Sequence, residues 1–177
     1  MKKSIKYLIL FLVLTNSMFA QKRQIDSLIS VLKSDKIKNL HDTIKCRTMI
    51  DLSWLLVYSN PDSALHLTLR AKKLAGSNHK LLEGACYHAL GWFYNRKAEY
   101  TKSLESYDNA MAIWKKYSLL EKEAATLGNI GSVYADMGDI PKGLDYYFKS
   151  QLICEQLGLK NEIAIGNNNN QINYRGH

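Results

Sequence analysis

The 177-residue chain contains only two prolines and three cysteines, and no segment alternates between polar and apolar residues as a strand does. Three cysteines without framework spacing exclude a disulfide-stapled scaffold. We therefore expect Cys46 and Cys86 to be small buried side chains, with Cys154 the candidate for a free thiol. The missing alternation excludes a β-sandwich or barrel. The sequence predicts an all-α protein.

Motifs for enzymatic chemistry are also missing. Four glycines crowd the stretch from Leu127 to Leu152, but none of them is followed directly by Lys-Ser or Lys-Thr, as a phosphate-binding Walker loop requires. A dinucleotide fingerprint would need a preceding strand. The five histidines form no i, i+4 pair and no H-E-x-x-H motif, and no serine occupies a G-x-S-x-G elbow. We expect no catalytic residue, no cofactor and no metal site.

Positive charge is in excess but is not concentrated. The chain has 24 lysines and arginines against 16 aspartates and glutamates. The basic residues occur singly or in pairs such as Lys72-Lys73 and Lys115-Lys116. No block of basic residues interleaved with aromatic residues appears, so we expect solvated helix surfaces and no nucleic acid partner.

The first 20 residues differ from the rest of the chain. Three lysines precede an apolar run from Tyr7 to Leu14, which polar residues and then Ala20 follow. This order predicts a secretory signal peptide over residues 1–20, with cleavage after Ala20. The mature chain would then be exported, to the periplasm or cell envelope, and would have no membrane association. The alternative is an uncleaved anchor, although the run is shorter than the about 20 apolar residues that a span needs.

An internal repeat organises the middle of the chain. The segment around Leu90-Gly91 recurs 40 residues later at Ile130-Gly131, and 38 residues earlier a weaker copy contains Leu52. Each copy holds two runs with apolar residues three and four apart, which predicts two amphipathic helices. Such hairpins bury their apolar faces only by stacking. The expected helix pairs are about Thr43–Gly76, Leu81–Tyr117 and Leu119–Gly158, after a lead helix at about Gln24–Leu32 and its linker within residues 21–42.

The spacing resembles that of the tetratricopeptide repeat, W-x2-L-G-x2-Y followed by A-x3-F. The second copy reads Tyr87-x2-Leu90-Gly91-x2-Tyr94, then Ser103-x3-Tyr107-x2-Ala110. The resemblance covers Thr43 to about Lys160, within the predicted repeat region of residues 43–160. It departs from the family in its longer period and in the absence of the closing proline. It implies a right-handed solenoid of about three tetratricopeptide-like helix hairpins.

The glycines of the third copy fit this resemblance. Gly131 is expected to be the packing glycine of a close helix crossing, and Gly138 the turn glycine before Asp139. We expect Gly128 on an exposed face.

The resemblance also implies a binding surface. In this family the first helix of each pair lines a concave groove that takes a peptide or a partner helix. The residues that match groove positions are Trp54, His88, Trp92, Asn95, Arg96 and Asn129. The alternative for both tryptophans is packing between repeats. The implied function is that of an exported protein–protein interaction module with a protein or peptide partner.

Residues 161–177 begin like another first helix, but asparagines occupy positions that would have to be buried. They are expected to be a polar tail or a truncated fourth repeat. Exported arrays with long repeats resemble the N-terminal sensor regions of bacterial histidine kinases and nucleotide cyclases. A truncated sensor region is therefore the alternative function.

Overall fold

The computed structural model describes residues 22–32, 41–76 and 78–159. Within these ranges the chain forms seven helices and no strand, which confirms the all-α prediction. The predicted signal peptide over residues 1–20 and the predicted polar tail or fourth repeat over residues 161–177 lie outside the described residues.

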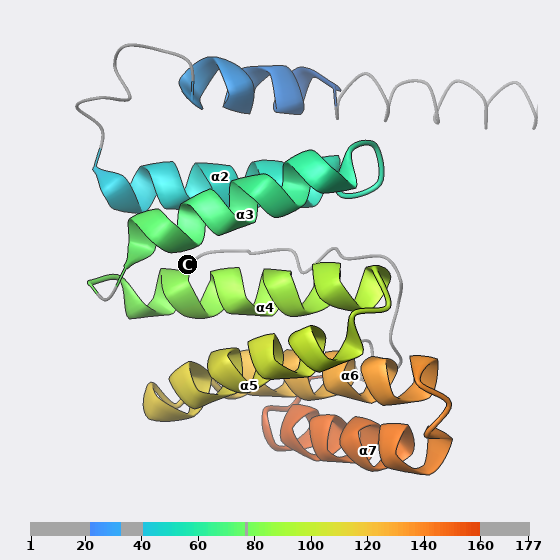
Figure 1. Cartoon of the computed structure of the whole chain (residues 1–177). Coiled ribbons are helices and arrows are strands. Elements are labelled where there is room, and N and C mark those ends of the chain that lie inside the picture. The colour runs from blue at the N-terminus through green and yellow to red at the C-terminus, as the bar shows by residue number, and fades with distance from the viewer. Residues whose placement is uncertain (1–21, 33–40, 77, 160–177) are drawn as a thin grey trace, which may run out of the picture.

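The helices follow one another in chain order from the top of Figure 1 to the bottom. An unlabelled first helix over residues 22–32 corresponds to the expected lead helix. The others are α2 (Asp42–Leu56), α3 (Pro61–Ala75), α4 (Lys80–Arg96), α5 (Tyr100–Lys116), α6 (Leu120–Asp136) and α7 (Ile140–Gln156). These bounds agree with the expected helix pairs to within a few residues.

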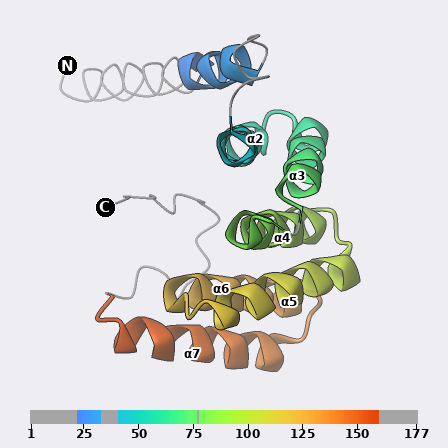
Figure 2. The same ribbon diagram turned by 90° about the vertical axis from the view of Figure 1, so that its left-hand side faces the viewer.

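Packing contacts divide the six labelled helices into three pairs, α2 with α3, α4 with α5 and α6 with α7. The pairs join because α3 packs on α4 and α5 packs on α6. The first helices of the pairs also contact each other, α2 with α4 and α4 with α6. Figure 2 shows the same succession from the side. The contacts place α2, α4 and α6 next to one another along the stack.

Local sequence explains where the helices begin. Asn60 precedes a proline, and its side chain accepts a hydrogen bond from the backbone N–H of Ser63 at 3.0 Å. Asp139 caps α7 in the same way. Both caps satisfy backbone donors that have no partner inside the helix. At the start of α2 the cap is His41, whose Nδ1 accepts a hydrogen bond from the backbone N–H of Thr43 at 3.4 Å.

The turns that follow the helices of the second and third pairs have left-handed backbone at matching positions. Gly138 has φ +88° and Gly158 has φ +67°. One repeat earlier the same positions hold Ala98, with φ +56°, and Ser118, with φ +53°. A residue with a Cβ pays roughly 1–2 kcal/mol in this conformation. The helix pair α4 and α5 therefore has the same turn geometry as the pair α6 and α7, but with residues that favour left-handed backbone less than glycine does.

The glycine on α6 lies at a close helix crossing, as the sequence predicted. A Cβ added to Gly131 would lie 2.9 Å from the carbonyl oxygen of Gly143 on α7. At the matching place on α4, a Cβ on Gly91 would lie 2.6 Å from the ring of Tyr107. The expectation for Gly128 was wrong: this glycine is buried on α6, a helix that contacts α4, α5 and α7.

The three cysteines are free thiols buried in the interior, which confirms the predicted burial of Cys46 and Cys86 and the free thiol of Cys154. Burial raises the pKa of Cys86 to about 12 and also raises the pKa of Cys154. Neither thiol is therefore ionised near neutral pH, and both act as small apolar side chains.

Candidate functional site

The six residues predicted to line a groove come from three adjacent helices. Trp54 lies on α2 and Asn129 on α6, and the other four lie on α4. Residues three and four apart share one face of a helix. His88, Trp92, Asn95 and Arg96 therefore lie along one side of α4. The structure divides the six into an aromatic group toward α2 and a polar group toward α6.

The aromatic group joins α2 to α4. The ring centroids of Trp54 and Trp92 lie 5.6 Å apart in an edge-to-face arrangement, and Trp54 also stacks on Phe93 at 5.8 Å. Tyr58 approaches Trp92 edge-on at 6.3 Å, and the guanidinium of Arg96 lies 5.7 Å from the centroid of the Trp92 ring. Both tryptophans remain partly exposed. They therefore pack between the helices and also present ring surface to solvent.

The polar group joins α4 to α6 around His88. Its Nδ1 lies 2.9 Å from Thr126 Oγ1, and the side-chain amide of Asn129 lies 3.1 Å from its Nε2. The indole N–H of Trp114, on α5, donates to Thr126 Oγ1 at 3.2 Å. Thr126 in turn donates to the carbonyl oxygen of Lys122 at 2.7 Å. One buried hydroxyl therefore connects three helices.

These contacts define the protonation state of His88. The amide of Asn129 can donate only to an unprotonated Nε2, so the proton of the neutral ring lies on Nδ1 and is donated to Thr126. Burial, with a smaller contribution from the positive charge of Lys122, lowers the pKa of His88 to about 4. Near pH 7 the ring is thus uncharged. It joins α4 to α6 through hydrogen bonds and does not transfer protons.

Asn95 makes the third link, at the end of the stripe. Its Nδ2 donates to the carboxylate of Asp136 at 2.8 Å, and the hydroxyl of Tyr100 donates to the carbonyl oxygen of Asp136 at 3.3 Å. The Oδ1 of Asn95 is buried and has no hydrogen-bond partner, the one such side-chain atom among the described residues. Its orientation is fixed, since only the amide nitrogen can donate to a carboxylate. Among the described residues no donor satisfies this acceptor.

Sequence reasoning missed three residues of the aromatic and polar groups. Tyr58 lies one helical turn beyond Trp54, a spacing that would have revealed it. Thr126 and Trp114 carried no such signal, because their hydrogen bond depends on how α5 and α6 pack.

No group of histidine, cysteine and acidic side chains that could hold a metal ion occurs among the described residues. In the same part of the chain, none of the helices combines the length and the apolar character that crossing a bilayer requires.

Comparison with known proteins shows the fold. A scan against protein-family models finds no match, and a search of the curated proteins finds none. Among solved structures, the chain is similar to BtubC (BKLC) from P. vanneervenii, with a TM-score of 0.63 and 21% sequence identity. The match covers 78% of this chain and 59% of BtubC, so the chain spans about three fifths of that protein's length. At this identity the likeness extends to the helical, repeat-like fold alone.

Proposed function

We propose that this chain is a protein–protein interaction module, a right-handed solenoid of tetratricopeptide-like helix pairs that binds a segment of a partner protein. The binding surface is the side where α2, α4 and α6 lie next to one another. The sequence repeat and the packing of the helices in successive pairs support the solenoid. Solenoids of this kind present extended surfaces to their partners.

One observation carries the assignment of the surface. The unpartnered Oδ1 of Asn95 lies one helical turn from Trp92 on the same helix. A buried acceptor without a partner costs free energy, and a donor from a bound segment would remove that cost once the segment displaces the atoms that cover Asn95 Oδ1. Tyr58, 64% exposed, and Arg96 flank the ring of Trp92. Aromatic and arginine side chains are favoured anchors of interfaces.

The acceptor also indicates the conformation of the bound segment. Backbone N–H groups inside a helix already have partners, whereas those of an extended segment are free. We therefore favour an extended peptide over a helix, with a backbone N–H donating to Asn95. An acidic side chain of that peptide would lie near Arg96, and an apolar one on Trp92 and Tyr58.

The experiment begins with peptides selected from a random library on the immobilised chain, whose affinities are then measured with variants. We expect Tyr58→Ala and Arg96→Ala to weaken binding with little change in melting temperature, because both side chains are largely exposed. Trp92→Ala should weaken binding by about 2 kcal/mol or more. Phe148→Ala on α7, where the ring is 66% exposed, is the matched control and should leave affinity unchanged.

Two results would refute the groove. One is a set of folded variants that bind as well as the natural sequence. The other is a Trp92→Ala chain whose loss of binding follows its loss of structure, while Tyr58→Ala and Arg96→Ala bind normally. The second result would leave packing between helices as the role of both tryptophans.

The proposed export rests on the pattern of residues 1–20. If a signal peptide is removed, N-terminal sequencing of the protein from its native cells should begin at Gln21. The alternative function, a truncated sensor region of a histidine kinase or nucleotide cyclase, remains a prediction. An antiserum against the chain would test it, because a sensor protein in those cells would be much larger than 20.2 kDa.

A further inference from the structure

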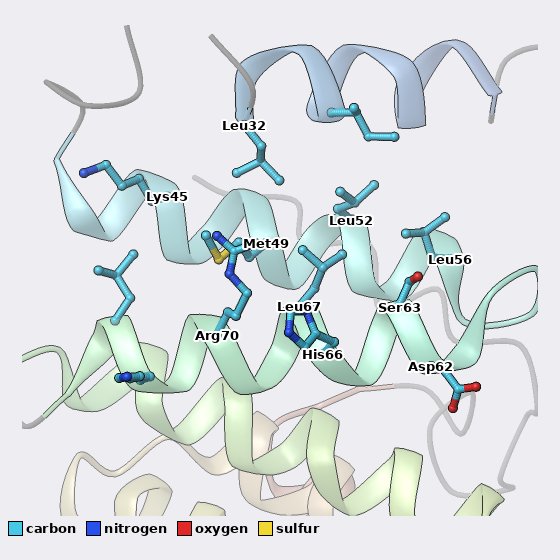
Figure 3. A pocket seen from close by; sticks show the side chains of 13 residues that line it. Leu32, Lys45, Met49, Leu52, Leu56, Asp62, Ser63, His66, Leu67 and Arg70 are labelled. Atoms are coloured by element: carbon cyan, nitrogen blue, oxygen red, sulfur yellow. The ribbon is translucent and has the colours of Figure 1, made fainter. Parts of the chain in front are cut away.

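A cavity of about 1260 Å³ lies at the N-terminal end of the stack, away from the groove. Figure 3 shows it between the helix over residues 22–32, α2 and α3. Small-molecule sites usually occupy about 300–1,000 Å³, so this space is large enough for an elongated ligand.

Most of the cavity wall is apolar. Met49, Leu52 and Leu56 follow one face of α2, and Leu67 lines the cavity from α3. Leu32 faces them from the helix over residues 22–32. The three residues of α2 extend over about two turns, roughly 11 Å at 1.5 Å per residue. The wall is thus a strip that suits a linear apolar chain.

One end of this strip is basic. Lys45 lies one turn before Met49 on α2, and Arg70 and Lys73 lie on the C-terminal half of the antiparallel α3. Lys45 already forms an ion pair with Asp42 at 3.0 Å. Neither Arg70 nor Lys73 pairs with an acidic side chain of the described residues. The other end of the strip holds Leu56 and the exposed Asp62.

We propose that this cavity binds a fatty acid, with its carboxylate at Arg70 and Lys73 and its acyl chain along the leucines of α2 and α3. The arrangement pairs a run of apolar wall with positive charge at one end, which complements a single-chain anionic amphiphile. An arginine can bind a carboxylate through two parallel hydrogen bonds. The proposal is independent of the peptide groove on α4.

A helix from a partner fits the cavity less well. A helix with its side chains is about 10–12 Å across, and the helix over residues 22–32 already covers the apolar strip (Figure 3). A partner helix would have to displace it, whereas an acyl chain would lie beneath it.

The test uses the full chain and cis-parinaric acid, a fatty acid that fluoresces in apolar surroundings. We expect saturable binding that lauric acid displaces at about pH 8, where its carboxyl group is ionised. The uncharged alcohol of the same length, 1-dodecanol, should displace the probe at least about tenfold less well, because it lacks the charge-assisted hydrogen bonds.

Variants locate the site. The double variant Arg70→Gln with Lys73→Gln should bind lauric acid at least about tenfold more weakly. Leu67→Trp should fill the apolar strip and abolish binding of the probe. Replacing Lys115→Gln and Lys116→Gln together on α5 makes the same change of charge away from the cavity and should leave binding unchanged. Absence of saturable binding, equal displacement by the acid and the alcohol, or unchanged affinity in the Arg70 and Lys73 variant would each overturn the proposal. That variant changes only exposed side chains, so its result stands even if Leu67→Trp fails to fold.

Discussion

Helix α4 makes two junctions of opposite chemistry. Toward α2 it presents Trp92 and Phe93, whose ring centroids lie 5.6 and 5.8 Å from that of Trp54. Toward α6 it presents His88 and Asn95, whose links are hydrogen bonds of 2.8–3.1 Å. The same repeat position thus carries a tryptophan in one copy and, 40 residues later, Ser132.

The difference matters because the two chemistries respond differently to change. Aromatic packing depends on buried area and tolerates small shifts of geometry. A buried hydrogen-bond network is directional, and each partner that is lost leaves another group unsatisfied. We expect the α2–α4 junction to respond mainly to loss of volume, and the α4–α6 junction to respond to loss of single polar atoms and to protons.

The largest effect should come from removing an aromatic ring. Phe93 is 3% exposed and stacks on Trp54. Phe93→Ala should lower the free energy of unfolding by about 3–5 kcal/mol, because it loses buried area and leaves a cavity. Urea unfolding followed by circular dichroism measures this loss. Val133→Ala, the matching change on α6, removes fewer atoms and should cost less. An equal or greater loss at Val133 would contradict an α2–α4 junction held by ring packing.

Acid should act on the other junction. His88 has a pKa of about 4 in the folded chain against an ordinary value of 6.5, so the unfolded chain binds this proton more readily. The contribution of the neutral His88 ring to the free energy of unfolding is complete above about pH 6.5 and is lost as the pH falls toward 4. At 1.36 kcal/mol per pKa unit, the loss by pH 5 is about 2 kcal/mol.

Unfolding midpoints at pH 7 and pH 5 measure this loss for the natural chain and for His88→Phe. The variant should be less stable at pH 7 but should lose less stability between the two values. His66→Gln, an exposed histidine on α3, is the control and should keep the full pH dependence. An identical pH dependence in His88→Phe would show that another group responds to the acid.

The two junctions also show what the sequence could and could not predict. Helix pairs followed from the spacing of apolar residues, and Gly131 followed from its place in the repeat, because close packing requires small residues wherever the pattern recurs. The contact of Trp54 with Trp92 could be expected from matched positions in adjacent copies. The left-handed turns at Ala98 and Ser118 could not be predicted, because no glycine occupies these positions.

The hydrogen-bond partners were less accessible to sequence reasoning. Predicting that His88 meets Thr126 and Asn129 requires the rotation and offset of α6 against α4, which a repeat period does not contain. The cavity beside Arg70 depends likewise on how the helix over residues 22–32 lies across α2 and α3. Burial of Gly128 was mispredicted for the same reason, since the side of α6 that is covered depends on tertiary packing.

A single hydroxyl should matter at the polar junction. Thr126→Val keeps the shape of a fully buried side chain but leaves the Nδ1 of His88 and the indole N–H of Trp114 without their acceptor. We expect a loss of about 1–3 kcal/mol in the free energy of unfolding, from the unsatisfied donors. Thr68→Val on α3 is the matched control. Thr68 is also fully buried, but its hydroxyl donates only within its own helix, to Ala64 at 3.0 Å. Equal losses at the two threonines would mean that the network adds nothing beyond burial.

The smallest effect on stability is expected at Asn95 and Asp136, and it bears most directly on function. Their hydrogen bond lies at the exposed edge of the polar junction, so a double-mutant cycle of Asn95→Ala and Asp136→Ala should give a coupling of only about 0.5–1 kcal/mol. Asn95→Ala also removes the buried acceptor that has no partner in the chain, and this partly offsets its cost.

If that acceptor serves a bound peptide, Asn95→Ala should weaken peptide binding far more than it lowers stability. Asp136→Ala, which leaves Asn95 Oδ1 in place, should weaken binding much less. Equal losses of affinity in the two variants would mean that Asn95 only joins α4 to α6, and that the polar junction contributes nothing to the proposed peptide site.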